Sequence, residues 1–286
     1  MQTVESLLDL RNAVHTWKQA GESVALVPTL GNLHEAHLQL VDFARTRADR
    51  VVVSIFVNPL QFGLGEDFNS YPRTETEDAR LLATRETDLL YLPGVAVMYP
   101  RDAQSMTRVV VPGLSDRYCG ESRPGHFEGV ATVVCKLLNQ VQPDIGVFGK
   151  KDYQQLLVIE RLVADLDMPV KIAGVETVRE HDGLAMSSRN RYLDDQQRSQ
   201  ATGLSKMLGT LAQSCKKGHQ DYRALESEGI KILEQAGFRP DYVVICRKND
   251  LEPATGNDHD LVILGAGYLG KARLIDNISV TVGIPA

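Results

Sequence analysis

The chain of 286 residues lacks the features that mark several classes of protein. No apolar run approaches the roughly 18 residues that a membrane span requires, and candidates such as residues 51–57 have only the length of a strand. The four cysteines include no C-x-x-C pair. Disulfides and a zinc ribbon are therefore disfavoured, and we expect buried thiols in a reducing cytoplasm. The first residues show no basic start followed by an apolar block, so we expect no signal peptide.

Positively charged residues are also outnumbered by negatively charged ones. Lys and Arg total 31 against 37 Asp and Glu, which gives a formal net charge of −6 and a pI near 5.7. Nucleic-acid binding needs a basic face to neutralise phosphates, so the charge balance argues against it. Apolar residues make up 43% and charged residues 24% of the chain, an ordinary globular composition. At about 150 residues per domain, the length predicts two domains.

Strand-like and helix-like segments alternate over residues 1–176. This alternation predicts an α/β domain with a Rossmann-like, doubly wound parallel sheet, whose ligand loops lie at the carboxyl ends of the strands. The predicted helices are residues 3–20, 34–48, 128–141, 152–165 and one starting at a capping box, Thr74-x-x-Glu77. The predicted strands are residues 24–27, 51–57, 89–93, 108–112, 144–148 and 170–175.

The pattern changes after residue 176. Two helical stretches, 195–216 and 220–236, precede strand patterns at 241–247, 260–266 and 272–282. Strands with little helix between them predict a smaller α+β domain over residues 177–286, with an antiparallel sheet.

A glycine-rich segment in this second domain matches a nucleotide-binding motif only superficially. Gly265, Gly267 and Gly270 form G-x-G-x-x-G, followed by Lys271. A dinucleotide site needs a following helix and an acidic residue some 20 positions on, yet only sixteen residues remain. A Walker A loop needs Ser or Thr after the lysine, where this chain has Ala272. We interpret the segment as a glycine-rich bend between two strands.

Two histidines near residue 35 carry a stronger signal. His34 and His37 follow a strand and a turn at Gly31, at the start of a predicted helix. Residues three apart share a helix face, and helix N-terminal amides favour an anion. Three interpretations compete. A metal site is disfavoured because H-E-x-x-H has a spacing of four; the histidines could be surface or N-capping residues; or they could donate to nucleotide phosphates.

Further blocks extend this motif in order between residues 24 and 193: PTLGNLHEAHLQLV, VVVSIFVNPLQF, YPRT, SRPGHFEGVATVV, FGKKDYQQL and DGLAMSSRN. With them the sequence resembles the pantoate–β-alanine ligases, or pantothenate synthetases, a family of the nucleotidyltransferase superfamily with an H-x-G-H motif. The resemblance implies a ligase of coenzyme A precursor biosynthesis. It would use ATP to join pantoate to β-alanine through a pantoyl-adenylate, releasing AMP and pyrophosphate.

The same resemblance implies a site, residue by residue. His34, His37 and Lys151 would be catalytic, with His37 as proton donor. Gln61 and Gln155 would bind pantoate, Gln61 also β-alanine, and Asn58 is a candidate third amide. The implied ATP-binding residues are Leu30, Gly31, His34, His37, Gly149, Lys150, Lys151, Asp152, Val178, Met186, Ser187, Ser188 and Arg189.

Other expectations concern the surroundings of this site. Residues 1–176 would bind nucleotide and pantoate, and residues 177–286 would close over the active site. Loops 62–73 and 123–126 are predicted to form a lid that excludes water from the adenylate. Mg²⁺ would arrive on the ATP phosphates rather than in a protein cage. The family resemblance implies a homodimer, and we expect no nucleic-acid or membrane partner.

The sequence departs from the family pattern at three positions. Ala36 replaces the glycine of H-x-G-H, and its methyl group is expected to weaken ATP binding slightly. Lys150 stands where an acidic residue is common and adds positive charge, and Leu30 replaces a common methionine with little change in volume.

Two alternative functions remain open. One is an adenylyltransferase acting on a phosphorylated acceptor, which would need further cationic groups. The other is a nucleotide-binding regulator without turnover, which would be expected to lack His34, His37 or Lys151, all of which are present.

Overall fold

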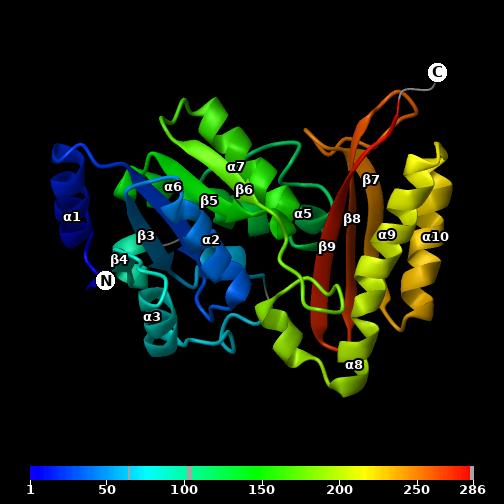
Figure 1. Cartoon of the computed structure of the whole chain (residues 1–286), viewed down its shortest axis with the longest axis horizontal. Helices are drawn as coiled ribbons and strands as arrows, with labels where there is room; N and C mark the ends of the chain where they lie inside the picture. The colour runs from blue at the N-terminus through cyan, green and yellow to red at the C-terminus, as the bar shows by residue number, and fades with distance from the viewer. Residues whose placement is uncertain (64, 102–104, 284–286) are drawn as a thin grey trace. The chain divides into compact units, whose positions relative to one another are not determined.

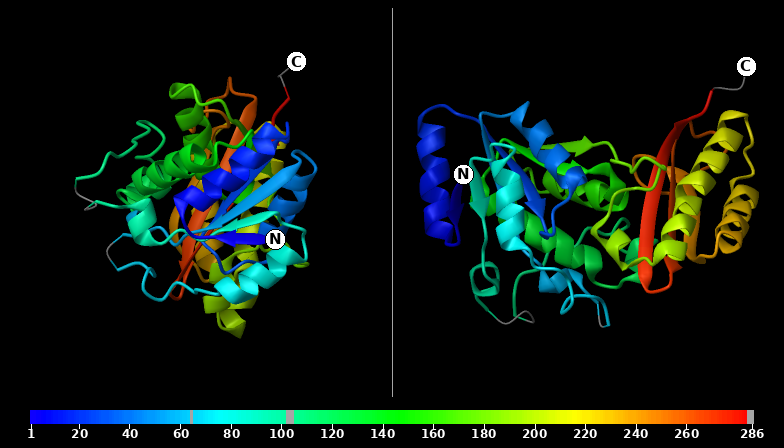
Figure 2. Two further views of the ribbon diagram at one scale, coloured as in Figure 1. Left: turned by 90° about the vertical axis from the view of Figure 1, so that its left-hand side faces the viewer. Right: turned by 60° about the horizontal axis from the view of Figure 1, so that its bottom comes forward.

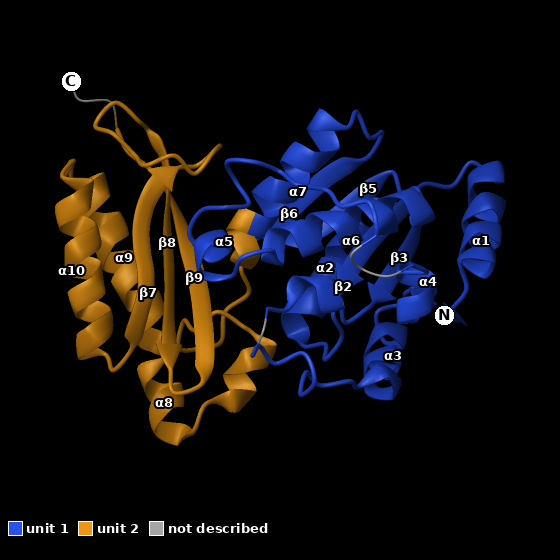
Figure 3. Cartoon of the chain, turned by 180° about the vertical axis from the view of Figure 1, so that it is seen from behind, with its two compact units in different colours: residues 1–150, 155–176 blue, residues 151–154, 177–286 orange. Residues whose placement is uncertain are grey.

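The computed structural model describes residues 1–63, 65–101 and 105–283, and the chain divides into two compact units. Unit 1 consists of residues 1–150 and 155–176, and unit 2 of residues 151–154 and 177–286 (Figure 3). Each unit contains its own hydrophobic core.

Unit 1 is built on a six-stranded sheet in the order β1-β4-β3-β2-β5-β6. Every neighbouring pair is parallel, which confirms the predicted doubly wound sheet. The strands are β1 (Gln2–Val4), β2 (Val24–Thr29), β3 (Arg50–Ile55), β4 (Leu89–Tyr91), β5 (Ile145–Gly149) and β6 (Lys171–Val175).

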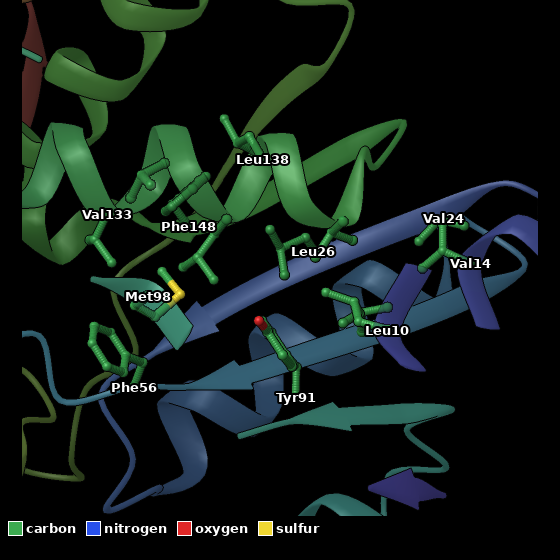
Figure 4. Close-up of a cluster of buried hydrophobic side chains, with 14 of the residues drawn as sticks. Leu10, Val14, Val24, Leu26, Phe56, Tyr91, Met98, Val133, Leu138 and Phe148 are labelled. Carbon is green, nitrogen blue, oxygen red and sulfur yellow. The ribbon is translucent and has the colours of Figure 1, made fainter. Parts of the chain in front are cut away.

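Helices cover both faces of this sheet, which explains why its central strands are almost continuously apolar. Along β2, Val24 and Leu26 contribute to one hydrophobic cluster, while Ala25 and Val27 contribute to the other. Figure 4 shows the first cluster, in which Leu10 of α1 and residues of α6 approach the sheet. The helices are α1 (Leu7–Gln19), α2 (Glu35–Arg45), α3 (Glu75–Ala83), α4 (Val95–Met98), α5 (Cys119–Ser122), α6 (His126–Val141) and α7 (Tyr153–Asp165).

Two 3-10 turns leave the carboxyl side of the sheet. Turn η1 (Pro59–Gln61) follows β3, and turn η2 (Lys150–Asp152) follows β5 directly. In the sequence, Lys151–Gln154 lies between β5 and the greater part of α7, and it belongs to unit 2.

Unit 2 contains a three-stranded antiparallel sheet in the order β7-β8-β9, as the sequence predicts. Helices α9 and α10 pack together and contact its strands (Figures 1 and 2). Leu204, Met207 and Leu208 of α9 are fully buried in the shared core. The elements are η3 (Ser188–Tyr192), α8 (Asp195–Gln200), α9 (Thr202–Lys216), α10 (Tyr222–Gln235), β7 (Arg239–Arg247), β8 (Asp260–Leu269) and β9 (Ala272–Thr281).

Several local predictions were wrong. Residues 108–112 form no strand: Val109 donates its N–H to Thr132 Oγ1 of α6 at 3.0 Å, and Val111 is buried. The predicted capping box also fails, because the Thr74 hydroxyl donates to Asp78 instead of capping α3.

The glycine-rich segment is a strand followed by a tight turn, rather than a bend throughout. Gly265 and Gly267 lie inside β8, and only Gly270, with φ of 54°, turns the chain into β9. A Cβ at Gly265 would lie 2.9 Å from Leu204 Cδ1, so the glycine lets α9 approach the strand closely. No helix follows this segment, as expected.

All four cysteines are free; Cys119, Cys215 and Cys246 are buried, and Cys135 is half-buried. Within the described ranges, no helix combines the length and the apolar character needed to cross a membrane.

Candidate active site

The carboxyl edge of the unit 1 sheet contains a topological switch point. From β2 the chain runs outward to β3 and β4, and later returns to the other side of β2 to form β5 and β6. Loops that leave β2 and β5 therefore diverge, and α/β proteins bind ligands in the crevice that such loops leave. Leu30 follows β2 at this edge, Gly149 ends β5 there, and Lys150 begins η2.

The loop after β2 has a backbone that its sequence specifies closely. Gly31 has φ of 83° and Asn32 of 52°. A Cβ at Gly31 would lie 2.9 Å from Ile55 Cγ2 and 3.1 Å from Asp78 Oδ2, so both conformation and space require glycine.

Asp78 of α3 holds this loop through hydrogen bonds. The main-chain N–H groups of Asn32 and Leu33 donate to its two carboxylate oxygens at 2.9 and 2.8 Å. The Thr74 hydroxyl donates to the same carboxylate at 3.1 Å. Asp78 is only 1% exposed, so these hydrogen bonds replace the water that its charge would otherwise need. The loop is thereby fixed to α3 immediately before the two histidines.

His34 and His37 lie together at the start of α2. His34 is the N-cap residue and His37 lies in the first turn, with ring centroids 4.1 Å apart. Both side chains are half-buried. The His34 main-chain N–H donates to His37 Nδ1 at 3.3 Å. Since Nδ1 accepts, the neutral imidazole carries its proton on Nε2, which can donate to an anion.

The loop after β3 carries the predicted amide residues, beside the loop after β2. Phe56 N–H donates to the carbonyl of Thr29 at 3.1 Å, so the two strand ends run side by side. Asn58 is fully buried and Gln61 is 9% exposed. Asn58 Nδ2 donates to Gln61 Oε1 at 3.0 Å, which leaves Nε2 as the part of the Gln61 amide that can donate to a substrate.

Asn58 is at the centre of an internal hydrogen-bond network. Its Nδ2 also donates to the carbonyl of Gly129 at 3.1 Å, and its Oδ1 accepts from Tyr99 OH at 2.6 Å and from Leu60 N–H at 3.2 Å. Burial raises the pKa of the Tyr99 hydroxyl above its ordinary value, so this group remains a donor. These bonds fix the Asn58 amide, which in turn holds the Gln61 side chain through its Oε1.

Helix α6 packs directly on this turn. A Cβ at Gly129 would lie 2.2 Å from the carbonyl oxygen of Leu60, so glycine is required for the close approach. His126 Nδ1 lies 2.8 Å from the Gln61 carbonyl, and Arg123 Nη2 donates to the same oxygen at 3.3 Å.

An ion pair joins the two loops predicted to form a lid. Arg123 Nε and Nη2 donate to the two oxygens of Glu66 at 2.6 Å each. Burial alone would raise the pKa of Glu66, but the hydrogen bonds and charge of Arg123 outweigh it and hold the pKa below its ordinary value. Residue 64 of the first loop lies outside the described residues.

The remaining predicted residues of unit 1 are half-buried. Ala36 is in the first turn of α2, and Gln155 lies on α7. Lys150 forms an ion pair with Glu176, which balances the positive charge that the sequence adds at this position.

The other predicted ATP-binding residues lie in unit 2. Lys151 and Asp152 begin its first segment, and Val178 and Met186 pair across a hairpin through Met186 N–H and the Val178 carbonyl at 2.9 Å. The hairpin leads into Ser187, whose hydroxyl accepts from Arg189 N–H at 3.3 Å. The structure therefore groups the predicted residues into two sets, one in each unit.

Several residues that support this site have no motif in the sequence. Asp78 and Tyr99 in unit 1, and Asp276 and Asn277 in unit 2, are buried and hydrogen-bonded. Asp276 and Asn277 lie in a largely apolar strand, and a polar residue in such a position was an available signal, because a buried polar side chain needs a partner. Asp78 gave no such signal, because it stands among the charged residues at the start of α3. In the described part of the chain, no three His, Cys, Asp or Glu side chains gather as a metal site would require.

The chain is similar in sequence and in structure to known proteins. The family model described as pantoate-beta-alanine ligase matches residues 2–279. A pantothenate synthetase of Alkalilimnicola ehrlichii is 53% identical over 98% of this chain and 98% of its own. The crystal structure of pantothenate synthetase from Thermus thermophilus has a TM-score of 0.91 and 44% identity, covering 97% of this chain and 99% of that one.

A second solved structure contains ligands. The pantoate-beta-alanine ligase from Francisella tularensis, complexed with beta-gamma ATP and beta-alanine, has a TM-score of 0.81 and 32% identity, covering 97% of each chain.

Proposed function

The chain belongs to the pantoate-beta-alanine ligase family, and we propose that it joins pantoate to β-alanine with the residues described above. It is an ATP-dependent ligase that forms an amide bond and releases AMP and pyrophosphate. The observation that carries the proposal is the pair of imidazoles that follows β2, at the start of α2, while the loop with Gln61 follows the neighbouring strand β3.

The first step is the formation of pantoyl-adenylate. A carboxylate oxygen of pantoate attacks the α-phosphorus of ATP, and the bond to pyrophosphate breaks. Negative charge then collects on the phosphoryl oxygens and on the leaving group, so catalysis depends on positioning and electrostatic stabilisation. His37 Nε2 and the amides at the start of α2 supply donors for this charge.

Cationic side chains would bind the same phosphates. We assign Lys151 and Arg189 to this task, together with Ser187 and Ser188. A lysine acts as a point charge on phosphate, whereas an arginine binds it as a planar fork. Magnesium would be carried by the phosphates and water, because this ion dehydrates reluctantly.

Neutral amide side chains suit the binding site for pantoate. Gln61, oriented by Asn58, and Gln155 would hydrogen-bond pantoate without adding a positive charge that weakens its carboxylate as a nucleophile. In the second step the β-alanine amine attacks the acyl carbon, the bond to AMP breaks, and the amine loses a proton. Water must be excluded until then, and the Glu66–Arg123 pair would hold the lid loops together.

We also propose a homodimer working in a reducing cytoplasm. The cytoplasmic assignment is supported by the absence of disulfides among the four cysteines, and the dimer is only what the resemblance of the sequence to the family implies.

One assay tests the function. Purified protein is supplied with ATP, magnesium, pantoate and β-alanine, and AMP and pantothenate are measured. We expect both products in equal amounts, with AMP release dependent on pantoate. AMP that forms equally well without pantoate would contradict the ligase assignment and would instead indicate hydrolysis of ATP.

Two substitutions test the assigned residues. His37→Ala and Lys151→Ala are expected to lower kcat roughly a hundredfold or more, as loss of a transition-state donor does. The matched controls, His15→Ala and Lys216→Ala, change exposed residues of α1 and α9 and should leave the rate unchanged. Near-normal rates in His37→Ala or Lys151→Ala would remove that residue from the mechanism.

A further inference from the structure

Two neighbouring residues of strand β9 are polar and buried. Asp276 is 3% and Asn277 is 8% exposed. A buried carboxylate or amide is costly unless it is hydrogen-bonded. Successive side chains of a strand point to opposite faces, so these two residues can serve two different segments of unit 2.

Asn277 holds the segment that begins with Lys151. Its Nδ2 donates to the main-chain carbonyl of Lys151 at 2.9 Å. Two residues further on, Tyr153 OH donates to the carbonyl of Lys248 at 2.9 Å. These bonds hold residues 151–154 in unit 2, although the chain on both sides of them belongs to unit 1.

Asp276 holds the hairpin that precedes Ser187. Its carboxylate accepts from Arg179 Nη1 at 2.6 Å and from Arg179 Nη2 at 3.0 Å. The same guanidinium donates to the Gly183 carbonyl at 3.1 Å and to the Asn277 carbonyl at 3.4 Å. The Asp276 side chain is 2% exposed and the Arg179 side chain 32%, so the carboxylate of this bidentate pair is shielded from water while the guanidinium is partly exposed.

The hairpin is in turn joined to the turn that carries Arg189. Asn190 Nδ2 donates to Glu180 Oε1 at 2.9 Å and to the Ala185 carbonyl at 3.1 Å. A continuous chain of hydrogen bonds thus runs from Asp276 through Arg179 and the hairpin to η3.

We propose that Asp276 and Asn277 are a positioning pair, which sets the places of Lys151 and of Ser187–Arg189 relative to each other. Neither residue is assigned a contact with substrate. The inference rests on the proposed function, in which Lys151 and Arg189 bind the phosphates of ATP. A rigid strand suits this task, because the charges must converge on a triphosphate within a fraction of an ångström to stabilise its transition state.

The first test changes Asn277 alone. Asn277→Asp keeps the size of the side chain but cannot donate to the Lys151 carbonyl. We expect kcat/KM for ATP to fall roughly tenfold in pantoate-dependent ATP–pyrophosphate exchange, since small misplacements of catalytic groups cost factors of this order or more. The KM for pantoate should change less than twofold. Asn277→Ala, which introduces no charge, should show the same pattern if the aspartate variant does not fold.

A double-mutant cycle shows whether Asn277 acts through Lys151. We expect Lys151→Ala combined with Asn277→Asp to be no slower than Lys151→Ala alone, because the lysine is already lost. Asp276→Asn should be non-additive with Arg189→Ala in the same way. A merely structural role would instead give losses that multiply.

The matched control is another shielded ion pair of the same sheet. Arg273 of β9 pairs with Asp241 of β7 at 2.7 Å, with side-chain exposures of 14% and 18%. Asp241→Asn should lower the melting temperature without changing the KM for ATP.

The results distinguish a failure of the proposed function from a failure of the positioning pair. If Lys151→Ala retains its rate, the proposed role of Lys151 fails and the pair has nothing to position. If Lys151→Ala is impaired but the Asn277 variants keep normal ATP kinetics, or if the losses multiply, the positioning pair is overturned and the proposed function stands.

Discussion

At the scale of single residues, the loop before the two histidines depends on one carboxylate. Asp78 accepts from two successive main-chain N–H groups while it is almost fully buried. In Asp78→Asn, one of these N–H groups would face an amide nitrogen. We expect the free energy of unfolding to fall by roughly 1–3 kcal/mol, as for other buried donors that lose a partner. The KM for ATP should rise, and the KM for pantoate should stay within twofold.

A second carboxylate provides the control for this variant. Asp88 accepts from Val51 N–H at 2.8 Å and from Arg50 Nη1 at 3.0 Å, near the amino ends of the strands. Asp88→Asn should lower stability in urea titrations but leave the KM for ATP unchanged. An Asp78→Asn enzyme that is less stable yet binds ATP normally would show that the carboxylate supports only the fold.

The sequence predicts those site residues that belong to local motifs. His34 and His37 lie at the start of a helix that follows a strand and a glycine turn, as predicted, because strand, turn and helix are local features. Asp78 and Asn277 were missed. Their partners are 45 and 126 residues away in the sequence, so only the folded chain brings them together.

At the scale of elements, the pair between the predicted lid loops should depend on pH. The pKa of Glu66 is lowered in the folded chain, so the pair contributes stability that is complete above the ordinary carboxyl pKa of 4.5. That contribution is lost as the pH falls through the lower folded pKa. We expect wild type to melt above Glu66→Gln at pH 7, with the difference shrinking below pH 4.5.

An exposed pair tests whether shielding matters. Glu77 and Arg80 also pair, at 2.7 Å, but their side chains are 55% and 65% exposed. Glu77→Gln should change the melting temperature little at any pH, because exposed pairs contribute little. A Glu66→Gln difference that persists unchanged at acid pH would show that the carboxylate charge is not what holds the loops.

The elements themselves were mostly predictable from patterns of hydrophobicity. Continuous apolar runs such as residues 51–53 identified strands buried on both faces, and periodic runs identified the helices. One predicted strand did not form. Residues 108–112 have strand-like composition, yet Val111 is buried and the Val109 N–H donates to Thr132 of α6, so the segment needs no neighbouring strand.

At the scale of the whole molecule, the proposed ATP-binding residues are divided between two units. The imidazoles and the loop after β2 belong to unit 1, whereas Lys151 and Arg189 belong to unit 2. Within its own unit each set is held by hydrogen bonds of buried side chains, the first by Asp78 and the second by Asp276 and Asn277. We propose that both sets bind one triphosphate.

A crystal structure of the protein with pantoate and an ATP analogue that cannot be cleaved between its α- and β-phosphates tests this proposal. We expect one nucleotide whose phosphate oxygens accept hydrogen bonds from His37 Nε2, Lys151 Nζ and the Arg189 guanidinium. A triphosphate held by the residues of one unit only, with the other set facing solvent, would contradict it.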